Sequence, residues 1–282
     1  MTKVDRPAAK EFSATRVAVL GVGKMGGILL EAFLEQKLFP PKNVFATVHH
    51  PERIEAVQKQ FPVSVTADNA AAVCQADVIL ICVKPQAVRE VLDEVRGELT
   101  PNKLVISIAA SVPIASIEKL AGDHIPVVRA MPNTPSVVRR GMTVLAKGAF
   151  AGPNHLAAAE KLFQAVGRTL VLAEKHMDAV TGLSASGPAF IYVILESLAE
   201  GGVKVGLPRD VATMLAAQTV LGAATVVLET GAHPALLKDA VTTPAGCTVD
   251  GLLELEEGRL RVTLIKAVVK AVERAKQLWF EP

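Results

Sequence analysis

Apolar residues follow two alternating spacings over the first 173 positions of the chain. Short β-branched runs predict strands at 16–22, 43–48, 63–65, 77–83, 104–109, 126–131, 142–148 and 169–173. Between several of these runs the apolar residues recur at helical spacing, as in 26–37 and after Pro51, Pro85 and Pro153. Strands that alternate with helices predict an α/β fold with a doubly wound parallel sheet, which is a Rossmann domain.

The pattern changes after residue 173, where strands stop and long helical runs follow. Helices are expected at 176–182, 187–203, 208–230, 233–241, 246–258 and 261–280. Pro188, Pro208 and Pro234 fall in first turns, where the missing N–H is tolerated. We therefore expect three parts: a flexible leader at 1–15, a Rossmann domain at 16–173 and an all-helical domain at 174–282.

The segment 211–228 is uncharged and long enough to cross a membrane. Thr, Gln and Gly residues dilute its apolar character, so we expect a helix buried inside protein rather than a membrane span. A small helical domain cannot cover such a helix by itself. The segment therefore predicts a partner subunit, most simply in a two-fold homodimer.

Composition narrows the classes of function. The chain has 282 residues with a formal charge of +2, and no basic stripe with interleaved aromatic residues, which argues against a nucleic-acid surface. Cys74, Cys82 and Cys247 lack paired spacing, so neither a disulfide framework nor a metal site is predicted. The first 15 residues have no apolar core of the kind a secretory signal needs. We expect a cytoplasmic location.

A glycine-rich turn lies between the first predicted strand and the first predicted helix. Gly21, Gly23 and Gly26 form a G-x-G-x-x-G pattern, in the place where a dinucleotide-binding fold needs it. The first glycine makes the tight turn, the second lets a pyrophosphate approach the backbone, and the third lets helix and strand pack closely. Lys24 and Met25 of this turn are expected to contact the cofactor as well.

The end of the second predicted strand indicates which dinucleotide binds. Thr47, His49 and His50 stand there, with Arg53 just beyond, while the nearest carboxylate, Glu52, lies in the next helix. Hydroxyl, imidazole and guanidinium groups suit a 2′-phosphate, so NADP(H) is expected in preference to NAD(H). Thr47, His49 and Arg53 are the predicted contacts; the alternative for the two histidines is a solvated loop.

Other cofactor contacts are expected where later strands end. The segments 82–86 and 129–135 follow strands predicted to be the fourth and sixth, at the carboxyl edge where open α/β sheets bind ligands. The residues expected at the ribose and nicotinamide are Val83, Lys84, Pro85, Ala109, Met131, Asn133 and Thr134. Ordinary turn chemistry is the alternative for these side chains.

Two turns in the second half place small residues ahead of a helix, at 182–190 and at 242–251. Free N–H groups and the positive end of a helix dipole make such places suitable for an anion, and hydroxyls such as those of Ser186 and Thr248 add donors. The second turn is interpreted as a carboxylate cradle beside a neutral donor, Thr248. Helix capping by Thr242, Thr243 or Ser186 is the alternative.

From Arg16 onward the chain resembles the pyrroline-5-carboxylate reductase family, through GVGKMGG, CVKPQ, RAMPNTP, TGLSASGPAF and HPALLKDAVTTPAGCTVDG. The resemblance implies a helical domain that binds substrate and dimerises, often into a ring of five dimers. It also implies reduction of a cyclic imino acid to L-proline with NADP(H) or NAD(H). The same resemblance places Thr243, Gly246, Cys247 and Thr248 at the carboxylate and imine nitrogen, with Thr248 as the catalytic donor.

Some positions depart from the family pattern. Thr242 and Thr243 replace serines, Ala185 and Ala245 replace glycines, and Phe190 replaces a tyrosine. Two other functions stay open at this point. A hydroxyacid dehydrogenase would need a catalytic lysine, for which Lys204 and Lys238 are the candidates, and an NADPH-sensing regulator would bind cofactor without turnover.

Overall fold

The computed structural model describes residues 12 and 14–278, which divide into two compact units. The first unit contains the sheet and extends through Ala185. It also includes the end of the last helix, from Ala271 onward. The second unit is Ser186–Lys270. The sequence analysis placed the division at 173. Residues 174–185 belong to the first unit because Met177 is fully buried in its core and Glu174 pairs with buried Arg129 at 3.2 Å.

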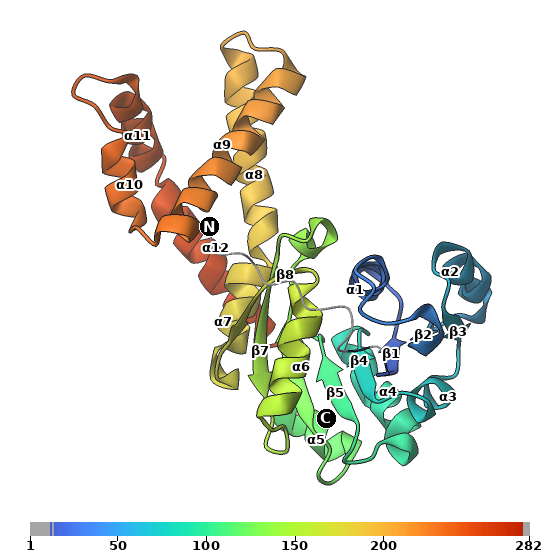
Figure 1. Ribbon diagram of the computed structural model, residues 1–282. Helices are drawn as coiled ribbons and strands as arrows, with labels where there is room; N and C mark the ends of the chain where they lie inside the picture. Colours follow the sequence, from blue (N-terminus) through green and yellow to red (C-terminus); the bar gives the residue numbers. More distant parts are fainter. Residues whose placement is uncertain (1–11, 13, 279–282) are drawn as a thin grey trace. The chain divides into compact units, whose positions relative to one another are not determined.

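The sheet of the first unit has eight strands in the order β3-β2-β1-β4-β5-β6-β7-β8 (Figure 1). The strands are β1 (Val17–Leu20), β2 (Val44–Thr47), β3 (Ser64–Thr66), β4 (Val78–Ile81), β5 (Leu104–Ser107), β6 (Val127–Met131), β7 (Gly141–Lys147) and β8 (Gly167–Val171). The doubly wound fold is therefore confirmed, with the reversal of strand order between β1 and β4.

One strand corrects the expectation of an all-parallel sheet. β7 runs antiparallel to β6, with Val128 opposite Lys147 and Met131 opposite Val144. Only the short 3-10 helix η5 (Thr134–Val138) joins the two strands. A parallel pair would need a crossover of a dozen or more residues, which this connection does not provide.

Helices cover both faces of the sheet. One apolar layer holds α1 (Lys24–Glu35), α2 (Ile54–Gln60) and α6 (Pro153–Gln164), centred on buried residues such as Phe33 and Phe163. The other holds α3 (Asn69–Cys74), α4 (Val88–Val95), α5 (Ile114–Ala121) and α7 (Met177–Val180). Central strands such as β1 and β4 are buried on both sides, which explains their continuous apolar runs.

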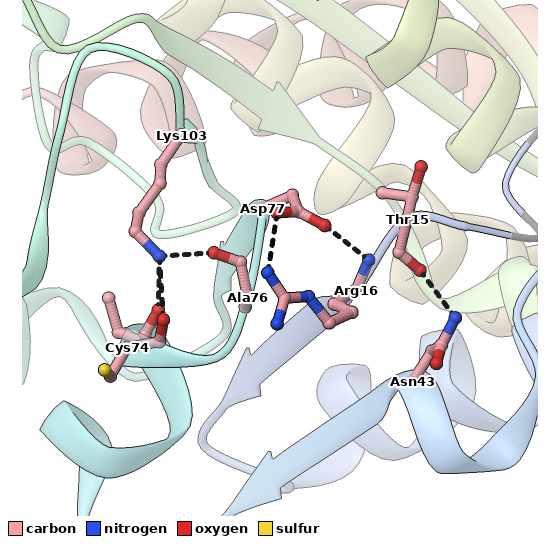
Figure 2. A network of polar contacts seen from close by, with 8 residues as sticks. Thr15, Arg16, Asn43, Cys74, Ala76, Asp77 and Lys103 are labelled. Atoms are coloured by element: carbon pink, nitrogen blue, oxygen red, sulfur yellow. Dashed lines mark hydrogen bonds and ion pairs between the residues drawn. The ribbon is translucent and has the colours of Figure 1, made fainter.

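The amino ends of the strands are tied together at the edge of the sheet opposite the glycine turn (Figure 2). The Arg16 backbone N–H and guanidinium both donate to Asp77, at 2.8 and 3.3 Å. Lys103 Nζ donates to the carbonyls of Val73 (2.8 Å), Cys74 (3.2 Å) and Ala76. The lysine thus satisfies carbonyls at the end of α3, where a cation is favoured by the helix dipole.

We expect Lys103→Met to destabilise the first unit, because the variant leaves these carbonyls without their charged donor. Loss of such a group costs about 1–3 kcal/mol. Urea unfolding at fixed protein concentration, followed by circular dichroism, measures the effect. The matched control is Lys119→Met on α5, an exposed lysine whose replacement should change the midpoint little. Equal midpoints for the two variants would contradict the capping role.

The second unit is all helical, as predicted (Figure 1). Its helices are α8 (Gly187–Lys204), α9 (Arg209–Thr230), α10 (Pro234–Ala240), α11 (Cys247–Glu257) and most of α12 (Leu260–Ala275). Arg209 donates to Glu200 at 2.6 and 3.3 Å, joining α8 to α9, and this hydrogen bond lowers the pKa of the Glu200 carboxyl. The pair therefore stays charged at neutral pH.

Burial within the second unit is sparse. Ala199, Ala212 and Ala216 form its small core, while large apolar side chains stay exposed along α8 and α9, among them Tyr192, Val193, Met214 and Leu221. The segments Glu174–Lys204 and Arg209–Thr230 are long and apolar enough to span a membrane by length and composition. The expected burial of α9 is therefore not achieved within the described part of one chain.

Candidate active site

The glycine turn joins β1 to α1 with the geometry that a pyrophosphate requires. Gly21 has φ +90°, and a Cβ there would lie 2.7 Å from Val83 Cγ1. A Cβ on Gly26 would lie 2.5 Å from the Gly21 carbonyl oxygen, whereas one on Gly23 would meet no atom within 4 Å. Gly23 is also the N-cap of α1 and offers no capping side chain. The turn thus leaves open space at an uncapped helix amino end, which suits an anion.

The end of β2 is hydrogen-bonded to this turn. Gly21 N–H donates to Thr47 Oγ1 at 3.1 Å, Val22 N–H donates to the Thr47 carbonyl at 2.8 Å, and the Thr47 hydroxyl donates to Asn69 Oδ1 at 2.7 Å. Thr47 is 1% exposed. This corrects its predicted role as a 2′-phosphate contact, because the hydroxyl is buried and already has both partners. Asn69, which the sequence analysis missed, holds Thr47 in place.

Three exposed side chains follow β2 beside the glycine turn: His49, His50 and Arg53. Both histidines are exposed, and the Arg53 guanidinium donates to the Val22 carbonyl at 3.2 Å. Arg53 is therefore held beside the glycine turn. This position agrees with the predicted contacts of His49 and Arg53 to a ribose phosphate, which stay predictions.

The later strand ends meet at the carboxyl edge of the sheet, since β4, β5 and β6 are parallel neighbours. Lys84 is exposed in the loop after β4, and Val83 packs against the glycine turn. Ala109 and Met131 are buried in the core, while Pro85 and Thr134 are partly exposed. Burial raises the pKa of the Cys82 thiol well above its usual range, so Cys82 stays protonated and packs against Gly26.

Asn133 connects three segments of the first unit. Its side-chain carbonyl accepts from Met142 N–H at 2.9 Å, and its amide donates to the Ser184 carbonyl at 3.1 Å. These bonds tie the loop after β6 to β7 and to the π-helix Thr181–Ala185. Asn133 thus positions this edge of the sheet, in addition to any cofactor contact.

The stretch 182–190 differs from its prediction as a turn. α7 continues through the π-helix, Ser186 is also helical (φ −82°, ψ −27°), and α8 follows at Gly187. No separate helix amino end forms at Ser186, because the upstream residues are already wound. Small side chains at Gly182, Ser184 and Ala185 permit this winding. The anion site predicted there is therefore corrected, and a contact from Ser186 to substrate stays a prediction.

The second predicted turn is a turn in the structure, between α10 and α11. Gly246 N–H donates to the Thr243 carbonyl at 3.0 Å, and Ala245 has φ +59°, a conformation that usually favours glycine. The Thr242 hydroxyl donates backward to the Lys238 carbonyl at 2.7 Å, and no side chain caps α11. The capping alternative is thus not supported. Cys247 and Thr248 begin α11, with Cys247 a free thiol.

The two lysines that an alternative mechanism would need have ordinary surroundings. Lys204 is an exposed residue at the end of α8, and Lys238 pairs with Asp239 at 2.5 Å, close to solvent. Over the part of the chain that the structure describes, no group of three or more His, Cys, Asp or Glu residues could hold a metal ion.

The nucleotide-binding turn, the doubly wound sheet and the helical second unit define a Rossmann-type oxidoreductase. Comparison with known proteins specifies it further. Residues 174–278 match the family described as pyrroline-5-carboxylate reductase dimerisation, and residues 16–111 match NADP oxidoreductase coenzyme F420-dependent. The pyrroline-5-carboxylate reductase of Methanosarcina acetivorans is 43% identical over 93% of this chain and 97% of that protein. The chain belongs to the pyrroline-5-carboxylate reductase family, which confirms the resemblance seen in the sequence.

Solved structures agree with this assignment. The pyrroline-5-carboxylate reductase of Coxiella burnetii superimposes with a TM-score of 0.86 at 35% identity, covering 95% of this chain and 99% of that one. The Plasmodium falciparum enzyme, solved with NADP bound, has a TM-score of 0.85 at 28% identity and covers 94% and 98%. The match to the dimerisation family covers the second unit and supports homo-oligomerisation.

Proposed function

We propose that the protein reduces the C=N bond of 1-pyrroline-5-carboxylate to give L-proline, using NADPH in preference to NADH. The observation that carries the proposal is the open, uncapped helix amino end at Gly23, in a chain 43% identical to a reductase of this name. The reaction adds a hydride to the imine carbon and a proton to the imine nitrogen. One imino acid, one reduced nicotinamide and one proton give one proline and one oxidised nicotinamide.

The first unit is proposed to hold the coenzyme, which supplies the hydride when it is bound. Gly21, Gly23, Lys24, Met25 and Gly26 would surround the pyrophosphate, because that turn leaves the space and the N–H groups that it needs. His49 and Arg53 would meet the 2′-phosphate. The residues proposed for the ribose and nicotinamide are Val83, Lys84, Pro85, Ala109, Met131, Asn133 and Thr134.

The second unit is proposed to bind the imino acid through the turn before α11. Cys247 would offer its backbone N–H to the substrate carboxylate, with Gly246 and Thr243 beside it and Ser186 as a further contact. Thr248, half-buried as the second residue of α11, would donate its hydroxyl hydrogen to the imine nitrogen. An imine is already electrophilic, so orientation and one donor suffice, and this explains why no acid–base side chain is needed.

Assembly and location complete the proposal. The exposed apolar face of α8 and α9 supports a homodimer, and five dimers in a ring are proposed as the full assembly. The protein is proposed to act in the cytoplasm.

The test is oxidation of NADPH or NADH, followed by absorbance, with three substrates offered in parallel. These are pyrroline-5-carboxylate, pyrroline-2-carboxylate and a six-membered cyclic imino acid. We expect the highest kcat/KM with pyrroline-5-carboxylate and NADPH. A higher kcat/KM with either other imine would refute the proposed substrate, and a higher value with NADH would refute the coenzyme preference.

Thr248→Ala is expected to lower kcat by roughly 10- to 100-fold while KM changes little. The variant removes one neutral donor, whereas the backbone N–H groups that bind the carboxylate remain. Thr248→Ser keeps the hydroxyl and should retain much of the rate. Coenzyme affinity, measured by titration, should be the same in both variants. Wild-type kcat and KM in Thr248→Ala would show that the residue has no part in the reaction.

A further inference from the structure

Two imidazoles and a carboxylate lie together in the segment from Thr47 to Arg53, which follows β2 beside the glycine turn. We call this segment the corner after β2. The rings of His49 and His50 are 4.5 Å apart in an edge-to-face arrangement. His50 Nδ1 lies 3.8 Å from Glu52 Oε1, with these side chains 61% and 76% exposed. The pair is therefore open to a ligand rather than enclosed in the core.

This corner is fixed to the glycine turn at both of its ends. Thr47, before the histidines, accepts from Gly21 and Val22 N–H, and Arg53, after them, donates to the Val22 carbonyl at 3.2 Å. The intervening segment must stay beside the turn. In a doubly wound fold the end of β2 meets the adenosine ribose, whose 2′ substituent distinguishes NADP from NAD.

We propose that the His50–Glu52 pair makes coenzyme selectivity depend on pH, with NADP(H) favoured most when His50 is protonated. The inference rests on the proposed function, because it places the ribose at this corner. An imidazolium attracts the 2′-phosphate and offsets the Glu52 charge. Once the imidazole is neutral, the Glu52 carboxylate repels the phosphate and can accept instead from the 2′-hydroxyl of NAD(H).

The other charged side chains on the elements around this corner are paired, cap a helix or lie beside the glycine turn. Asp68 caps α3 by accepting from Ala71 N–H at 2.8 Å, Glu94 of α4 accepts from Asn69, and Glu55 of α2 pairs with Lys59 at 2.6 Å. Lys24 begins α1, and Arg53 lies within the corner. Of the two histidines, His50 is the one that lies beside a carboxylate, so the proposed dependence is assigned to His50.

The test is the ratio of the dissociation constants for NAD⁺ and NADP⁺, measured by calorimetry at pH 6.5, 7.5 and 8.5. Relative to His50→Gln, wild-type selectivity for NADP⁺ should fall about threefold to tenfold over this range, as expected for one exposed charge pair. Glu52→Gln should also lack this fall and keep high selectivity at pH 8.5. His124→Gln, an exposed histidine at the amino end of β6, is the control and should retain the wild-type slope.

The coenzyme's own 2′-phosphate loses its last proton near pH 6, which strengthens NADP⁺ binding as pH rises. That effect has the opposite sign and is common to all variants, so comparison between variants removes it. A ratio that changes with pH in the same way in the wild type and in His50→Gln overturns this inference and leaves the proposed function standing. A ratio that favours NAD⁺ throughout overturns the proposed coenzyme preference. A His124→Gln variant that loses the wild-type slope also overturns the role of the pair.

Discussion

Gly26→Ala is expected to lower NADPH affinity roughly 10- to 100-fold, which corresponds to about 1–3 kcal/mol of overpacking strain. The added Cβ would lie 2.5 Å from the Gly21 carbonyl oxygen and 3.2 Å from Cys82 Cβ. Neither obstacle is the end of a flexible side chain, so α1 must move away from β1 and β4. The same shift should cost about 1–3 kcal/mol of stability through overpacking. Coenzyme titration and urea unfolding measure the two effects.

Gly27→Ala is the matched control, one residue further along the same helix. A Cβ there meets no atom within 4 Å. Alanine is the better helix former, so this variant should gain about 0.5–1 kcal/mol and bind NADPH as the wild type does. Equal coenzyme affinities for the Gly26 and Gly27 variants would contradict the close-packing role of Gly26.

Leu221→Asp is expected to break the homodimer and abolish activity. Leu221 lies on α9 and is 56% exposed within one chain, in a helix that carries apolar side chains on many sides. If a partner covers this face, the aspartate becomes an unpaired buried charge in each subunit, at a cost of several kcal/mol per charge. Light scattering should then give the mass of a single 29.7 kDa chain, where the wild type gives at least a dimer.

The control for this variant is Ala157→Asp, which places the same charge at an exposed position on α6 of the first unit. It should keep the wild-type mass. A folded wild-type monomer at micromolar concentration, or a Leu221→Asp protein that stays oligomeric and active, would show that α9 does not form the subunit interface.

Much of the first unit could be predicted from local sequence patterns. The strands β4 and β6 fall within the predicted runs 77–83 and 126–131, and the glycine turn precedes α1 as expected. α3 and α5, of six and eight residues, were not predicted. The π-helix at Thr181–Ala185 was also missed, since its small residues are equally typical of a turn.

By itself the sequence determined the doubly wound class, the helical second half and the turns at Gly21–Gly26 and before α11, because these features follow from neighbouring residues. Only the tertiary structure decided that Thr47 is buried beneath the glycine turn and that Asn133 binds the π-helix. Their partners lie 26 and 51 residues away. It also decided the direction of β7. Such hydrogen bonds depend on which distant segments the packed sheet brings together, and periodicity along the chain carries no information about that choice.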